Sequence, residues 1–271
     1  MPVLDRGDTR IWQRRNRVQA LTHWAGWLIG TAIFVYCWQR ISDATTWFFV
    51  QDAPRIAGDI WTRATPPRWE YITQLGRPIW DTLNIATMGT LLALLMAVPV
   101  AFMAARNTTP SRVFVRPVAL LVIVSTRSIN SLIWALLLIA IIGPGVFAGV
   151  IAIAIRSIGF CAKLLYEAIE EIDHAQVEAI TATGASRWQV MAYGIVPQIL
   201  PALAGIAVFR WDINIRESTV LGLVGAGGIG LQLSSSLNVL AWPQVSLILL
   251  VILAFVVVGE WVSAKVRGAI I

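Results

Sequence analysis

Four arginines lie inside otherwise apolar segments of the chain, at Arg127, Arg156, Arg210 and Arg216. A guanidinium group stays charged at physiological pH and can donate two parallel hydrogen bonds to a carboxylate or another oxyanion. A basic side chain at the centre of a bilayer costs about 2.5–3.5 kcal/mol on insertion scales. We therefore expect these arginines to face protein or water, where they either pair with internal acids or bind an anion.

Both roles stay open for Arg216. Asp212 stands four residues earlier, one helical turn away, and Glu217 is adjacent, so an internal ion pair is an alternative to contact with a ligand. Arg127 and Arg156 have no acidic residue within four positions. Pairing along their own helix is therefore less favoured for these two.

A glycine-rich stretch follows these charges, with five glycines in the nine residues 222–230. Glycine destabilises a helix, and non-helical backbone occurs at membrane depth only where it is buried in protein or lines a cavity. A dinucleotide-binding glycine motif must follow a strand. This stretch follows an apolar helix, so we reject that function, and a simple tight turn remains the alternative.

A polar stretch at residues 173–201 separates two very apolar segments. Asp173 is a good N-cap for a first helix, and Gly184 is placed to end that helix in a left-handed turn. Ser186 and Gln189 have the spacing of a capping box, so a second helix begins at once. The sequence predicts a capped, polar helix-turn-helix that contacts something outside the membrane.

The elements that position these residues belong to a membrane protein. The chain has 271 residues, of which 57% are hydrophobic and 13% are charged, whereas soluble domains carry about 25% charged residues. Six apolar runs are long enough to cross a hydrocarbon core of roughly 30 Å. The expected spans are 18–39, 82–105, 117–142, 146–167, 194–221 and 243–261.

The first run is not followed by a small-residue cleavage site, which favours a membrane span over a signal peptide. Residues 51–63 are predicted to form an amphipathic helix on the membrane surface, which Pro66 and Pro67 end. The basic residues, net charge +6, gather in alternate loops, so they indicate membrane orientation rather than nucleic-acid binding. Their excess places both termini and the polar helix-turn-helix in the cytosol.

The polar stretch resembles the EAA loop of ABC-importer permeases. Glu178-Ala179, Gly184 and Pro197 keep the spacing of that loop, while Ile180 stands where the family has a third small residue. An ordinary helix-glycine-helix connector is the alternative. The glycine-rich stretch, together with residues 127–130, 143–149 and 163–168, resembles phosphonate-type permeases over about 70–265.

This resemblance implies an all-α, polytopic fold of the type I ABC importer permease kind, with six transmembrane helices and a cytosolic coupling helix-turn-helix. It implies a permease subunit of an ATP-driven importer that moves a phosphonate, phosphite or similar phosphorus oxyanion across the bacterial inner membrane. The implied partners are a second copy of the chain, two ABC ATPase subunits, a periplasmic substrate-binding protein and membrane lipid, with no nucleic acid. No phosphate loop occurs in the sequence, so ATP and Mg²⁺ are expected on the ATPase, and neither catalysis, a cofactor nor a metal is expected here.

We divide the chain into residues 1–79 and residues 80–271. The first part holds the N-terminal tail, the first span and a periplasmic interfacial segment, and the second is the permease core with a coupling loop at 171–193. The residues expected to couple to the ATPase are Glu178, Ala179, Gly184, Ala185, Ser186 and Arg187. Those expected along the translocation path are Arg127, Asn130, Arg210, Asp212, Arg216, Glu217, Ser218, Thr219, Gly225, Gly227 and Gly228.

Three other functions compete with this one. An ABC permease for another small solute would share the same features. An ion-coupled secondary transporter would need broken helices in both halves of the chain, but the glycine-rich break occurs once. A membrane enzyme acting on lipid phosphates would need clustered acids, and Glu167, Glu170, Glu171 and Asp173 do cluster, although a solvated docking face explains them more simply.

Overall fold

The structure is a computed structural model that describes residues 3–6, 9–12 and 17–270. The chain divides into two compact units, residues 1–62 and 63–271, and each is described by itself. The division at 79/80 expected from the sequence stays a prediction.

The first unit begins with two short antiparallel strands, β1 (Val3–Arg6) and β2 (Thr9–Trp12). The expected basic tail also includes Arg14 and Arg15, which lie outside the described residues. Helix α1 (Arg17–Ala44) covers the first predicted span, and large apolar side chains are exposed along its length. Helix α2 (Trp47–Ala64) confirms that residues 51–63 are helical.

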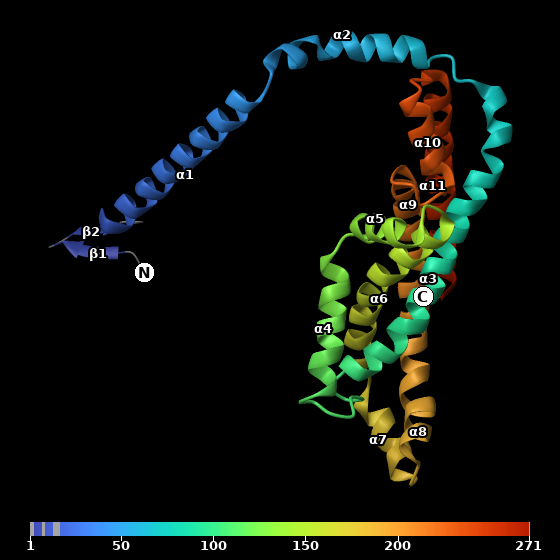
Figure 1. Cartoon of the computed structure of the whole chain (residues 1–271). Helices are drawn as coiled ribbons and strands as arrows, with labels where there is room; N and C mark the ends of the chain where they lie inside the picture. The colour runs from blue at the N-terminus through green and yellow to red at the C-terminus, as the bar shows by residue number, and fades with distance from the viewer. Residues whose placement is uncertain (1–2, 7–8, 13–16, 271) are drawn as a thin grey trace. The chain divides into compact units, whose positions relative to one another are not determined.

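Three long helices form the centre of the second unit (Figure 1). They are α3 (Gly76–Ala104), α6 (Val146–Glu170) and α9 (Val196–Leu223). Small residues bring α3 and α6 together, since a Cβ added at Gly89 would lie 2.7 Å from Ile153 Cγ2. Close approach through small residues is typical of helix packing in membranes. The other elements are η1 (Trp69–Gln74), α4 (Val115–Ser128), α5 (Ser131–Ile142), α7 (His174–Ala182), α8 (Arg187–Val190), the π-helical η2 (Met191–Ile195), α10 (Gly228–Asn238) and α11 (Trp242–Ile270).

The third predicted span, 117–142, is not one continuous helix. The chain leaves α4 at Ser128 and turns by 88° before α5 begins at Ser131. Asn130 has extended backbone, and its side-chain oxygen accepts a hydrogen bond from the Leu132 N–H, so it caps a new helix inside the apolar run. The third predicted span is therefore a broken span made of two helices.

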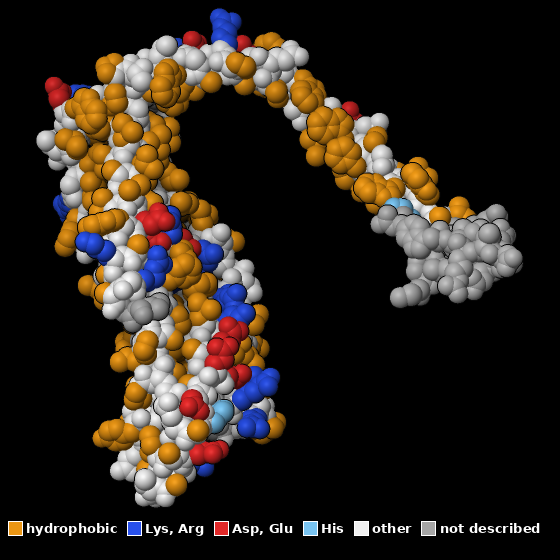
Figure 2. All heavy atoms as spheres, turned by 180° about the vertical axis from the view of Figure 1, so that it is seen from behind, with side chains coloured by type: hydrophobic (Ala, Val, Ile, Leu, Met, Phe, Trp, Pro, Cys, Tyr) orange, Lys and Arg blue, Asp and Glu red, His pale blue; other side chains and the backbone are white. Residues whose placement is uncertain are grey.

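Among the described residues, five segments are long and apolar enough to cross a membrane, or six when α4 and α5 count as one broken span. The six predicted spans agree with the second count. Hydrophobic side chains are spread along the length of the bundle in Figure 2, while most charged ones lie between its middle and the end that carries α7 and α8. This distribution fits a bundle surrounded by lipid, with a polar end in water.

Candidate functional site: a polar helix pair and a buried charge cluster

The polar helix pair forms as its sequence predicts. The Asp173 side chain accepts a hydrogen bond from the Ala175 N–H at the start of α7. Gly184 adopts φ +81°, the left-handed conformation that ends the helix. Ser186 and Gln189 form the predicted capping box at α8, with the Ser186 N–H donating to Gln189 Oε1 at 2.8 Å.

The residues expected to couple to an ATPase lie on the surface of this pair. Glu178, Ala179, Gly184, Ser186 and Arg187 are exposed, and Ala185 is half-buried. The pair is tied to the start of α9, because the Asp173 N–H donates to Gln198 Oε1 at 2.9 Å. A movement of the helix pair would therefore be transmitted to α9.

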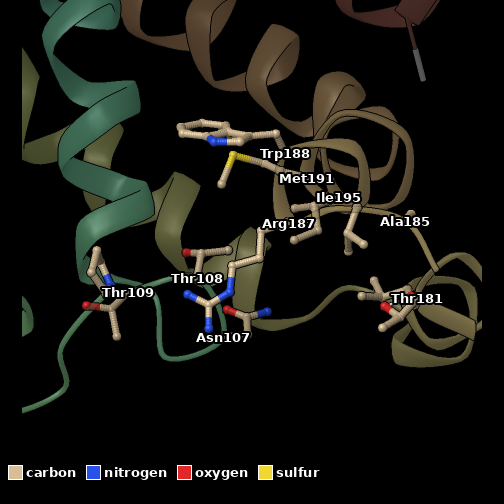
Figure 3. A pocket seen from close by; sticks show the side chains of 12 residues that line it. Asn107, Thr108, Thr109, Thr181, Ala185, Arg187, Trp188, Met191 and Ile195 are labelled. Atoms are coloured by element: carbon tan, nitrogen blue, oxygen red, sulfur yellow. Dashed lines mark hydrogen bonds between the residues drawn. The ribbon is translucent and has the colours of Figure 1, made fainter.

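A cavity of roughly 690 Å³ opens between the helix pair and the turn after α3. Figure 3 shows the Arg187 side chain extending toward Asn107 and Thr108, with Trp188 and Met191 above it. The Asn107 amide donates to the Ile169 carbonyl at 2.5 Å, and the Thr108 hydroxyl donates to the Phe102 carbonyl at 2.7 Å. The cavity wall is thus fixed by bonds to backbone.

The acids beside the helix pair serve structural contacts. Glu170 accepts the Arg106 N–H at 2.8 Å and lies 3.7 Å from Arg116 Nη2, which joins the turn after α3 to α6. Glu167 pairs with Lys163 one turn away at 3.5 Å. These pairings give Glu167 and Glu170 structural roles, and Asp173 caps α7.

The structure brings together three charges within the bundle. Glu217 on α9 bridges two arginines, pairing through Oε1 with Arg156 of α6 and lying 3.5 Å through Oε2 from Arg210. Arg210 is almost fully buried, donates to Ser157 Oγ at 2.9 Å and stacks over the Phe160 ring. Arg210, which was expected along the translocation path, is thus held inside the bundle.

A polar ladder supports this cluster. Asn214 is fully buried and donates to Thr90 Oγ1 at 2.8 Å and to Ser157 Oγ at 3.2 Å. Ser157 thereby accepts from both Asn214 and Arg210. Buried polar groups that are satisfied in this way fix one arrangement of the helices.

The internal pair expected at Arg216 is present. Arg216 donates to Asp212 one turn away, with the Arg216 side chain 44% exposed and that of Asp212 7%. The hydroxyls of Ser218 and Thr219 donate to backbone carbonyls of their own helix, and Ser218 is buried while Thr219 is half-buried. Arg127 is exposed near the end of α4.

The glycine-rich stretch breaks the helix after α9. Gly225, Gly227 and Gly228 have φ between +72° and +100°, which is costly for residues with a side chain. The Gly145 N–H donates to the Gly225 carbonyl at 3.1 Å. The break therefore lies against the turn between α5 and α6, buried in protein as expected.

Sequence reasoning missed the acidic partner of Arg156 and the polar residues Ser157, Asn214 and Thr90. Glu217 is 61 residues from Arg156, beyond any helical spacing. One signal was present: polar residues in an apolar run must find partners.

Long apolar helices, an exposed capped helix pair and charges paired inside the bundle define a polytopic permease of the inner-membrane kind. The family model described as "Binding-protein-dependent transport system inner membrane component" matches residues 75–267, and the chain belongs to this family. It is a multi-span membrane permease subunit of ABC importers, which work with ATPase and substrate-binding partners, and it is not a catalytic enzyme.

Two relatives show the range of names within the family. The phosphite transport system permease protein PtxC of Stutzerimonas stutzeri is 39% identical over 236 residues, which cover 87% of this chain and 84% of that protein. The phosphate-import permease protein PhnE of Mycolicibacterium smegmatis is 40% identical over 205 residues, covering 76% of this chain and 38% of that protein.

Solved structures share the fold. An inward-facing structure of the MetNI methionine ABC transporter has a TM-score of 0.64 at 20% identity, covering 75% of this chain and 99% of that one. A bacterial ABC transporter that imports alginate has a TM-score of 0.58 at 18% identity, covering 90% and 99%. The predicted all-α, type I importer fold is confirmed.

Proposed function

We propose that this chain is the transmembrane subunit of an ATP-driven importer that carries a phosphorus oxyanion, such as phosphite or a phosphonate, across the bacterial inner membrane. The observation that carries the proposal is the 39% identity to a phosphite permease over 87% of this chain. The second relative is named for phosphate, which has the same tetrahedral phosphorus centre. The family match over residues 75–267 includes the charge cluster and the helix pair.

The exposed helix pair supports a docking role for α7 and α8. We propose that Glu178, Ala179, Gly184, Ser186 and Arg187, with Ala185, contact an ATPase subunit that binds ATP and Mg²⁺. A second copy of this chain, two ATPase subunits and one periplasmic binding protein complete the importer. A transporter of similar fold was solved with its binding protein attached.

The basic residues support an orientation of the chain in the membrane. We place both termini and the loop 171–193 in the cytoplasm, because Lys and Arg are in excess on that side. Residues 1–79 form the tail, the first span and the periplasmic interfacial segment, and residues 80–271 form the core.

The translocation path is proposed along the charges of α9 and the glycine break. Fixed positive charge offsets part of the cost of moving an anion through a low-dielectric region. Ser218 and Thr219 are weak candidates, since their hydroxyl protons are used by backbone carbonyls. The path residues are Arg127, Asn130, Arg210, Asp212, Arg216, Glu217, Ser218, Thr219, Gly225, Gly227 and Gly228.

A second candidate is an ABC permease for another small solute, because the fold is shared with transporters of methionine and alginate. Reconstitution with the ATPase and binding protein separates the two. Uptake of labelled phosphite, phosphate and methylphosphonate is compared with that of methionine, with and without vanadate. We expect vanadate-sensitive uptake of a phosphorus oxyanion; uptake driven by an ion gradient alone, or of methionine alone, contradicts the proposal.

A further inference from the structure

Arg156 joins three elements of the bundle. Its Nη1 donates to Glu217 Oε1 on α9 and lies 3.4 Å from Ser131 Oγ at the head of α5. Arg156 stands ten residues into α6, about 15 Å along that helix. Since α6 has 25 residues, Arg156 lies near the middle of a helix that is long enough to cross a roughly 30 Å hydrocarbon core.

The charges around Arg156 do not cancel. Glu217 is shared between Arg156 and Arg210, so two guanidinium groups face one carboxylate. Asp212 is engaged by Arg216 one turn away and adds no net charge with that partner. One positive charge therefore remains in the cluster, and in a low-dielectric region it attracts an anion.

The two arginines differ in access. The side chain of Arg156 is 31% exposed and that of Glu217 is 16% exposed, whereas that of Arg210 is 3% exposed. Arg210 is held by Ser157 and by the Phe160 ring. Arg210 thus supplies a fixed charge behind the site, and Arg156 is the guanidinium that a solute can reach.

We propose that Arg156 binds the oxyanion during passage and that Glu217 is its exchangeable counter-ion, which occupies the guanidinium when no cargo is present. A carboxylate and a phosphorus oxyanion both offer paired oxygens to the planar donors of arginine, so one replaces the other without a large movement of Arg156. Ser131 positions the guanidinium, because its hydroxyl donates to Asn130 Oδ1 at 3.2 Å and turns a lone pair toward Arg156.

Competition by Glu217 keeps the binding loose. A pore site must hold its ion weakly enough to release it. The carboxylate returns to Arg156 as the oxyanion leaves, so Arg156 always has an anionic partner. The identity of the cargo as a phosphorus oxyanion rests on the proposed function.

The test uses the assembled importer in proteoliposomes, with labelled phosphite as the probe and four variants: R156Q, R156K, E217Q and the double variant R156Q/E217Q. R156Q should lower phosphite uptake about tenfold or more, the scale of a lost charge-assisted hydrogen bond. Phosphite uptake by R156K should lie between that of wild type and that of R156Q, since lysine keeps the charge and loses the paired donors. E217Q should lower both the half-saturating phosphite concentration and the maximal rate, because the competitor is gone.

The lysine variant separates binding from a structural ion pair, because E217Q also leaves the buried Arg210 without its acid. If the pair only holds α6 against α9, R156Q loses thermal stability and R156K regains both stability and full uptake, which overturns the proposal. If Arg156 binds cargo, R156K stays deficient in uptake even where its stability recovers, and so does the double variant. K163Q is the matched control, because Lys163 lies on the same helix in an exposed pair with Glu167, and its uptake should equal that of wild type.

Wild-type transport distinguishes the two proposals. A wild-type importer that carries phosphite while R156Q and the double variant carry it equally well overturns the role of Arg156 alone. A wild-type importer that carries only neutral solutes overturns the cargo class and this inference together.

Discussion

The hydroxyl of Thr82 on α3 accepts a hydrogen bond from the Ile229 N–H at the start of α10, at 2.8 Å, across 147 residues of sequence. The same hydroxyl donates to the Pro78 carbonyl at 2.8 Å, so it acts both as a donor and as an acceptor. Thr82 is fully buried. One side chain therefore fastens the glycine break to the first helix of the core.

Thr82→Val keeps the shape of the side chain and removes both bonds. We expect a loss of about 1–3 kcal/mol of stability, because the Ile229 N–H is left buried without a partner. The measurement is the thermal unfolding midpoint in detergent. Thr73→Val is the control, since the Thr73 hydroxyl is exposed and bonds only within its own turn, and equal midpoints for the two variants contradict the prediction.

Gly230→Ala should disrupt the packing of α10 on α9. A Cβ at Gly230 would lie 1.9 Å from the Thr219 carbonyl oxygen and 2.9 Å from Gly222 Cα, which no side-chain rotation relieves. Gly205→Ala meets nothing within 4 Å and should stabilise α9 by up to about 1 kcal/mol through helix propensity. The folded yield and the thermal midpoint should both fall for Gly230→Ala, and the midpoint should rise for Gly205→Ala. A tolerated Gly230→Ala would mean that α10 packs less closely on α9 than described.

Gly184→Val should uncouple hydrolysis from transport in the proposed importer. Gly184 has φ +81° and open space around it, so the effect is backbone strain of about 1–2 kcal/mol and not a clash. We expect an inserted protein whose ATPase partner still hydrolyses ATP without driving uptake, and the same for Glu178→Lys. Gly184→Asn tolerates the left-handed backbone and should retain uptake; wild-type uptake by both Gly184→Val and Glu178→Lys would refute docking at this surface.

Disulfide crosslinks test the proposed dimer. Six spans are few for a closed solute path, and two-fold dimers are the commonest symmetric assembly. In a Cys37→Ser background, which removes the exposed native thiol, single cysteines at Leu231 and Ser234 should crosslink between copies on oxidation. A cysteine at the exposed Val118 of α4 serves for comparison, and the absence of any dimer band at α10 argues for a path within one copy.

Arg210→Gln and Arg127→Gln should differ in stability. Arg210 is buried and bonded to Glu217 and Ser157, so its loss breaks a buried pair at a cost of about 3–5 kcal/mol. Arg127 is exposed, and its replacement should change stability by no more than about 0.5 kcal/mol. Thermal midpoints of the two variants check this, and a stable Arg210→Gln would show that Arg210 is not a structural charge.

Local signals in the sequence predicted local structure well. The Asp173 cap, the Ser186 and Gln189 box and the turn at Gly184 each depend on groups within three residues of one another, so spacing alone identifies them. The apolar runs predicted the spans for the same reason. Asn130 is a capping residue inside an apolar run, but no local signal indicates that the chain turns by 88° there.

Contacts between helices that are distant in the sequence could not be predicted from local spacing. Arg156 meets Glu217, and Asn214 meets Thr90, only because α3, α6 and α9 pack together in one particular rotation. The sequence indicated that buried arginines need partners and could not say which acid each would take. Glu217 is adjacent to Arg216 in the sequence, but its carboxylate pairs with Arg156 and Arg210.

The lengths of the helices set how the surrounding lipid is deformed. α3 and α11 contain 29 residues each, about 43 Å of helix, so they exceed a hydrocarbon core of roughly 30 Å and must tilt or project from it. α5 has 12 residues, about 18 Å, and meets α4 at 88°, so neither helix of this pair crosses the core by itself. A thinner bilayer would lessen the mismatch at α5 and increase it at α3 and α11, which would have to tilt further, so no single bilayer thickness matches every helix.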